Sequence, residues 1–170
     1  MLVIRPLAYF FLLAHIIFTA ITFGGAIYET MVINSVWYSN LPDSLRFMTN
    51  AEYSVKPGRF WQAFGPVPSV VTLLAFVFNL FIPGRRLLVT ISFLCILFNT
   101  LTTIFYFVPI LMVIFSPDGG GRSPDELTQM ALNWKNGTWI RMAALLVSLV
   151  LSIIALGVSP KRAESTAATA

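Results

Sequence analysis

Residues 87–117 read LLVTISFLCILFNTLTTIFYFVPILMVIFSP and contain no Asp, Glu, Lys or Arg. A helix needs about 20 mostly apolar residues to cross the hydrocarbon core of a bilayer. Three further charge-free stretches meet or approach this length, at residues 6–28, 60–84 and 142–160. Hydrophobic residues make up 57% of the chain and charged residues only 11%. This composition excludes a soluble enzyme, a nucleic-acid-binding protein and a disordered chain, and it predicts an all-α integral membrane protein.

The predicted fold is a four-helix bundle that forms one membrane domain over residues 1–158. Its four spans are expected at about residues 6–28, 60–82, 87–115 and 139–158. The third span exceeds what a perpendicular crossing needs, because at about 1.5 Å per residue it is longer than a core of about 30 Å, so it must tilt or protrude. Residues 159–170 are small and polar, which predicts a disordered cytoplasmic tail.

Two short structures are predicted on the outer side of the membrane. Leu41-Pro42-Asp43 is typical of a helix start and predicts a short interfacial helix with Leu45 and Met48 on one face. Ser123-Pro124-Asp125-Glu126 has the pattern of a capping box, with the serine as N-cap and the glutamate at the third helical position. It predicts a capped outer helix that leads, through a kink at Asn136-Gly137, into span 4.

Positive charge is divided unevenly between the two sides of the predicted bundle. With four spans, one side holds five basic residues and one acid: Arg5, Arg85, Arg86, Lys161, Arg162 and Glu164. The other side balances its six basic residues with six acids. Because cytoplasmic loops carry an excess of Lys and Arg, this distribution predicts that both termini lie in the cytoplasm.

Polar side chains inside a membrane are costly, so each one is a candidate for function. His15 lies on one face of span 1, and Asn99 lies on one face of span 3 with Tyr106. We expect both His15 and Asn99 to face the bundle interior, with spans 1 and 3 packed together. His15 has the intrinsic pKa of a general base or proton relay, but it is also suited to hydrogen bonding between helices. One histidine and one cysteine do not make a metal site, and no cofactor is expected.

A second group of polar residues is predicted at the outer membrane boundary. Glu29, Trp61, Tyr106 and Arg141 all fall about 30 Å or more from the cytoplasmic charges. We expect Glu29 and Arg141 to lie within salt-bridge reach, directly or through one water, with the two aromatic residues lining the same cavity. Two interpretations stay open: an ion pair that ties spans 1 and 4 together, or the rim of a pocket that opens outward.

Four segments of the chain form a recognisable set. They are Gly24-Gly25-Ala26-Ile27-Tyr28-Glu29, Phe60-Trp61 with the prolines that follow, residues 103–109 and residues 134–141. Over about residues 7–158 the chain resembles a bacterial family of small four-span membrane proteins of unknown function. That family is loosely grouped with fungal anthrone oxygenases.

The resemblance implies a four-helix bundle in a bacterial plasma membrane. It also implies oxidation of a polycyclic aromatic substrate without an obvious bound cofactor. The residues at matching motif positions are Tyr28, Glu29, Trp61, Tyr106, Asn136 and Arg141. With Asn99 these are the candidate binding residues, and the candidate catalytic residues are His15, Glu29 and Tyr106.

Three functions remain open from the sequence. The first is a non-enzymatic bundle that contacts membrane lipid and binds a lipophilic small molecule or a partner subunit, as an accessory protein or homo-oligomer. The second is a membrane-embedded oxygenase or oxidoreductase that acts on a lipophilic aromatic substrate. The third is a small transporter; against it, the acid Glu29 lies at the rim, where proton-coupled carriers place theirs near the midplane, and no inverted repeat is visible.

Overall fold

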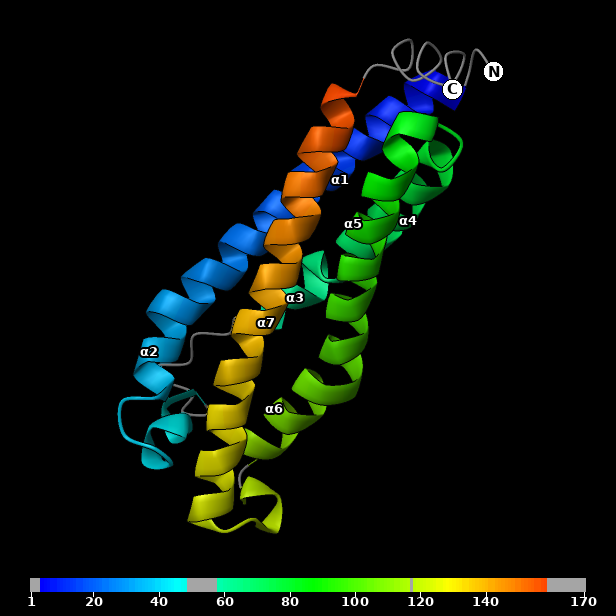
Figure 1. Ribbon diagram of the computed structural model, residues 1–170. Helices are drawn as coiled ribbons and strands as arrows, with labels where there is room; N and C mark the ends of the chain where they lie inside the picture. Colours follow the sequence, from blue (N-terminus) through cyan, green and yellow to red (C-terminus); the bar gives the residue numbers. More distant parts are fainter. Residues whose placement is uncertain (1–3, 49–57, 117, 159–170) are drawn as a thin grey trace.

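The computed structural model describes residues 4–48, 58–116 and 118–158, and the regular structure in them is helical. Four helical runs are long and apolar enough to cross a membrane: Arg5–Trp37, Gly58–Asn79, Pro83–Ile114 and Pro124–Gly157. Figure 1 shows them as an elongated bundle, in which the start of the first helix and the end of the last lie at the same end. The predicted all-α, four-span fold is confirmed. The chain is an integral membrane protein whose outward-facing apolar side chains contact lipid.

Helices that follow one another in the sequence are neighbours in the bundle. Helix α1 (Ile4–Tyr28) packs against α4 (Pro66–Asn79) and α7 (Pro124–Gly157). Helix α5 (Pro83–Thr102) packs against the same two helices. An up-and-down bundle places the first and third helices across its diagonal. The predicted packing of spans 1 and 3 is therefore limited to side chains that cross the core, such as His15 on α1 and Ser92 on α5.

The first span continues beyond the boundary that the sequence predicts. After Tyr28 the chain forms a π-helical turn, η1 (Glu29–Ile33), and then the short helix α2 (Asn34–Trp37). Trp37 is buried against Leu45 and Trp134 in an apolar cluster. Leu45 belongs to the 3-10 helix η2 (Asp43–Met48), so the predicted interfacial helix packs against the protein.

The second span is divided by the sequence Gly65-Pro66. Helix α3 (Gly58–Phe64) ends there, and α4 begins with Pro66 and Pro68 in its first turn, where missing N–H groups cost little. Helix α4 ends at Asn79, three residues before the predicted end of the span. Pro83 then starts α5, so Arg85 lies in the first turn of a helix and not in a loop.

The third span contains a second π-helical turn. Helix α5 passes into η3 (Thr103–Phe107) and then into α6 (Val108–Ile114). Pro109 lies in the first turn of α6, and a proline lacks the N–H and collides with the carbonyl four residues earlier. The wider turn before it accommodates this loss. Figure 1 shows α6 turning away from the axis of α5 toward α7.

The fourth span is one continuous helix. It follows η4 (Gly119–Gly121), whose three glycines have φ values of 61°, 61° and 70°, a region that other residues rarely adopt. The predicted capping box at Ser123 and Glu126 is confirmed, with both reciprocal hydrogen bonds present. Helix α7 then runs unbroken to Gly157, so the outer helix and span 4 form one element where the sequence predicts a kink.

Candidate binding site

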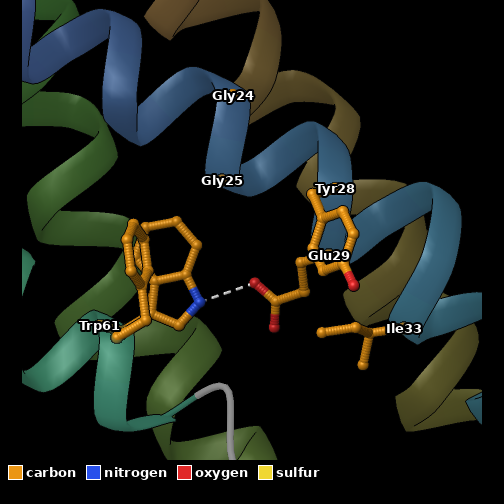
Figure 2. A pocket seen from close by; sticks show the side chains of 7 residues that line it. Gly24, Gly25, Tyr28, Glu29, Ile33 and Trp61 are labelled. Atoms are coloured by element: carbon orange, nitrogen blue, oxygen red, sulfur yellow. Dashed lines mark hydrogen bonds between the residues drawn. The ribbon is translucent and has the colours of Figure 1, made fainter.

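A pocket of about 380 Å³ opens between α3 and the outer part of the first span. It is lined by Gly24, Gly25, Tyr28, Glu29, Ile33, Phe60 and Trp61. Figure 2 shows Trp61 pointing across the pocket to the Glu29 side chain, while Tyr28 and Ile33 lie on the same helical run as the carboxylate. Three candidate binding residues, Tyr28, Glu29 and Trp61, are therefore gathered at one site.

Glu29 is the only ionisable acid or base among the pocket residues named above, apart from the phenol of Tyr28. The indole Nε1–H of Trp61 donates a hydrogen bond of 2.7 Å to its Oε2 atom. No other hydrogen bond or ion pair to this carboxylate occurs within the described part of the chain. A carboxylate surrounded by aromatic and aliphatic groups retains acceptor capacity for a group that enters the pocket.

The two glycines of the pocket differ in what surrounds them. A Cβ atom at Gly25 would lie 2.9 Å from Cε1 of Phe60, so the ring packs directly on the α1 backbone. A Cβ atom at Gly24 would meet nothing within 4 Å. Gly24 therefore borders open space at the edge of the pocket, and a Cβ atom added there would displace no protein atom.

A second polar cluster joins α5 to α7. Arg141 Nε donates a 3.1 Å hydrogen bond to Oδ1 of Asn99, and the guanidinium carbon lies 4.4 Å from the centre of the Phe107 ring. Gly137, one turn before Arg141, makes room for that ring, because a Cβ atom there would lie 2.8 Å from Cζ of Phe107. Asn99 faces the bundle interior, as predicted.

Glu29 and Arg141 do not form a direct ion pair. Each has its own partner, Trp61 and Asn99 respectively, and no nitrogen of Arg141 lies within 4.0 Å of a carboxylate oxygen of Glu29. The direct form of the predicted salt bridge is wrong, and the form bridged by one water stays a prediction. The two charges still attract each other, and Thr30 beside Glu29 donates a hydrogen bond to Sδ of Met142 beside Arg141.

The negative charge of Glu29 also acts on Tyr38, in the loop beyond the first span. Tyr38 follows the end of α2, and its half-buried phenol has a raised pKa. Burial is the main cause, and the negative charge of Glu29 adds to it. The ring also lies under the ammonium of Lys135, whose Nζ is 4.9 Å from the ring centre.

Two predicted site residues lie apart from the pocket. Tyr106 is 44% exposed and packs edge-on against Phe107, on the lipid-facing side of the third span. Asn136 is exposed on α7. Neither lines the pocket. The prediction that Tyr106 and Trp61 line the same cavity is therefore wrong.

His15 is buried at the centre of the bundle, as predicted. Its Nδ1 lies 2.8 Å from Oγ1 of Thr72, and its Nε2 lies 3.0 Å from Oγ of Ser92. Thr72 donates its hydroxyl hydrogen to the carbonyl of Pro68, so it accepts from His15 Nδ1–H. The other ring nitrogen, Nε2, faces the Ser92 hydroxyl, which also donates a 3.2 Å hydrogen bond to the carbonyl of Ser148. A carboxylate 14 residues farther along the same helix lies about 21 Å away, so His15 does not share the Glu29 pocket.

The Ser92 hydroxyl extends this network to the fourth span. Its Oγ lies 2.7 Å from Oγ of Ser148 and 2.8 Å from Oγ of Ser152. One hydrogen-bonded group thus joins α1, α4, α5 and α7 at the same depth. This arrangement favours the interpretation that His15 ties the helices together. Thr72 could not be identified from the sequence as a partner of His15, because a threonine in an apolar helix also commonly bonds its own backbone.

Another buried cluster lies at the opposite end of the bundle from Glu29. Arg85 is 5% exposed and donates to Oδ1 of Asn79 and to the carbonyls of Leu156 and Val158 at the end of α7. Asn79 in turn donates to the carbonyl of Ala8 in α1. The sequence identified Arg85 only as one of the basic residues on the cytoplasmic side, and its capping role was not predicted.

Across residues 4–48, 58–116 and 118–158, no three His, Cys, Asp or Glu side chains gather in an arrangement that could hold a metal ion. No family model, no curated protein and no solved structure matches this chain. The chemistry of the pocket residues is therefore the evidence that bears on function.

Proposed function

We propose that the protein binds a lipophilic molecule carrying a positive charge or a hydrogen-bond donor, in the pocket between α1, η1 and α3. The observation that carries this proposal is the Glu29 carboxylate, held by Trp61 at 2.7 Å inside a pocket whose other walls are mainly apolar. Small-molecule sites have volumes of about 300–1,000 Å³ and combine apolar walls with a few polar groups. The pocket, at about 380 Å³, has this character.

The backbone around Glu29 supports the proposal. Glu29 begins one of the two π-helical turns in the described chain, and the other ends at Phe107 beneath the Arg141 guanidinium. π-Helical turns are rare in proteins as a whole, but those that occur are often found at functional sites. They hold side chains at positions that a regular helix does not reach. Glu29, and the Phe107 ring on which Arg141 lies, thus owe their positions to irregular backbone.

A second candidate function is oxidation of a lipophilic aromatic substrate, as the family resemblance implies. The observation that favours it is a carboxylate with free acceptor capacity facing aromatic rings. Glu29 would take a proton from an activated ring CH₂ group, and molecular oxygen would be the oxidant. The CH₂ carbon would become a carbonyl, and the second oxygen atom would leave as water with both hydrogens. His15 and Tyr106 lie outside this pocket and have no part in the step.

Blocking the pocket is the first test. Gly24→Leu fills open space, so we expect it to preserve the melting temperature and to weaken binding of proflavine, a planar tricyclic cation, by about tenfold or more. Proflavine fluorescence titration of the full chain in detergent measures the binding. Ala20→Leu is the matched control, since Ala20 is exposed one turn away on α1 and does not line the pocket.

Unchanged proflavine affinity in Gly24→Leu would place the ligand elsewhere and contradict the proposal. Oxygen uptake on addition of anthrone separates the two candidate functions. Uptake that is present in the wild-type protein and abolished by Gly24→Leu supports the oxidation, whereas binding without uptake supports the binding function alone.

We also infer from the charge distribution described above that both termini lie in the cytoplasm. An alkaline phosphatase fused after Ala170 should therefore be inactive, since that enzyme requires the periplasm. A fluorescent protein that matures only in the cytoplasm should be bright at the same position. The reverse result in both fusions would overturn the orientation.

A further inference from the structure

A groove of about 440 Å³ runs along the outer face of the α4–α5 hairpin, at the opposite end of the bundle from Glu29. Its lining residues come from the end of α4, the turn and the first two turns of α5: Phe76, Leu80, Pro83, Arg86, Leu87 and Thr90. The four residues from α5 occupy positions i, i+3, i+4 and i+7, so they form one face of that helix. This face is turned away from the bundle core and toward lipid.

The groove combines apolar walls with one charge. Arg86 is exposed and forms no ion pair within the described residues, whereas its neighbour Arg85 is buried as a cap of α7. The side chains that flank it are apolar, and Leu87 is 69% exposed. A ligand that fits this groove has an anionic group next to a hydrocarbon chain.

The charge distribution of this end of the bundle favours an anion. Arg5, Arg85 and Arg86 lie here, and the described residues at this end include no acid. All five described acids lie at the other end: Glu29, Asp43, Asp118, Asp125 and Glu126. Basic residues at the end of a membrane span attract anionic headgroups.

We propose that this groove is a binding site for one anionic phospholipid. The phosphate pairs with the Arg86 guanidinium at the level of the headgroups. One acyl chain lies along Leu87 and Phe76, in the direction of the membrane interior. The site is separate from the Glu29 pocket, so it does not depend on the function proposed for that pocket.

Native mass spectrometry of the full chain tests this proposal. The protein in detergent is titrated with phosphatidylglycerol or with phosphatidylcholine of identical acyl chains. We expect one phosphatidylglycerol to bind about five- to tenfold more tightly than phosphatidylcholine, as one arginine near the surface would provide. Arg86→Gln should remove this preference, and raised salt should reduce it.

Two further variants keep the test decisive. Arg59→Gln removes the same charge from an exposed position on α3, outside the groove, so it should leave the preference unchanged. Thr90→Trp retains the charge of Arg86 but fills the groove, so it should lower retention of the lipid. Equal binding of both lipids, a preference that survives Arg86→Gln, or an equal loss in Arg59→Gln would overturn the proposal.

Discussion

Glu29→Gln should weaken binding of proflavine by about tenfold to a hundredfold while the bundle stays folded. A hydrogen bond to a charged group contributes about 1.5–3 kcal/mol, and each 1.4 kcal/mol corresponds to a tenfold change in affinity. The glutamine retains a side-chain oxygen that can accept from the Trp61 indole, so the contact seen at 2.7 Å is preserved. The expected melting temperature is therefore within a few degrees of that of the wild-type protein.

Anthracene, an uncharged tricycle, is the matched probe for this experiment. It should compete for the pocket equally well in the wild-type protein and in Glu29→Gln, because it makes no bond to the carboxylate. If Glu29→Gln instead lowers the melting temperature strongly and leaves proflavine affinity unchanged, Glu29 ties α1 to its neighbours and does not bind a ligand. Trp61→Phe further separates ligand binding by Glu29 from its role in tying helices together. This variant keeps an aromatic wall in the pocket and removes the hydrogen-bond donor to Glu29.

The number of spans could be predicted because it depends on length and hydrophobicity alone. The ends of the spans could not be predicted, because each charged residue was taken as the boundary of a span. Glu29 lies within a continuous helical run that reaches Trp37, since Trp61 from another helix satisfies its carboxylate. Arg85 likewise lies inside a helix, because the free carbonyls at the end of α7 accept its hydrogen bonds. Both partners are distant in sequence, so local patterns do not reveal them.

The depth of the candidate site residues could be predicted better than their direction. Counting residues along helices placed Glu29 and Trp61 at one level, and the structure joins them. The direction of the Tyr106 side chain was predicted wrongly. A regular helix would place Asn99, Thr103 and Tyr106 on one face. The π-helical turn from Thr103 adds a residue to that turn, so Phe107 faces the core and Tyr106 faces outward.

Arg85→Met should lower the melting temperature by at least about 6 °C. The guanidinium donates to Asn79 Oδ1 and to the carbonyls of Leu156 and Val158, and methionine supplies none of these bonds. Each buried acceptor left without a partner costs about 1–3 kcal/mol. For a chain of this size, 1 kcal/mol shifts the melting temperature by about 2–4 °C. A thermal melt in detergent without added lipid measures the effect.

Arg86→Met is the control for Arg85→Met, because it removes the same charge one residue later from an exposed side chain. We expect it to change the melting temperature by no more than a degree or two. The Asn79 side chain links the cap to α1 and to the Ala75 carbonyl, so Asn79→Leu should also destabilise the bundle. Combined with Arg85→Met it should cost less than the sum of the two, because residues in one hydrogen-bond network are coupled. Additive effects, or equal losses in Arg85→Met and Arg86→Met, would mean that Arg85 acts as a surface charge and not as the cap that joins α4, α5 and α7.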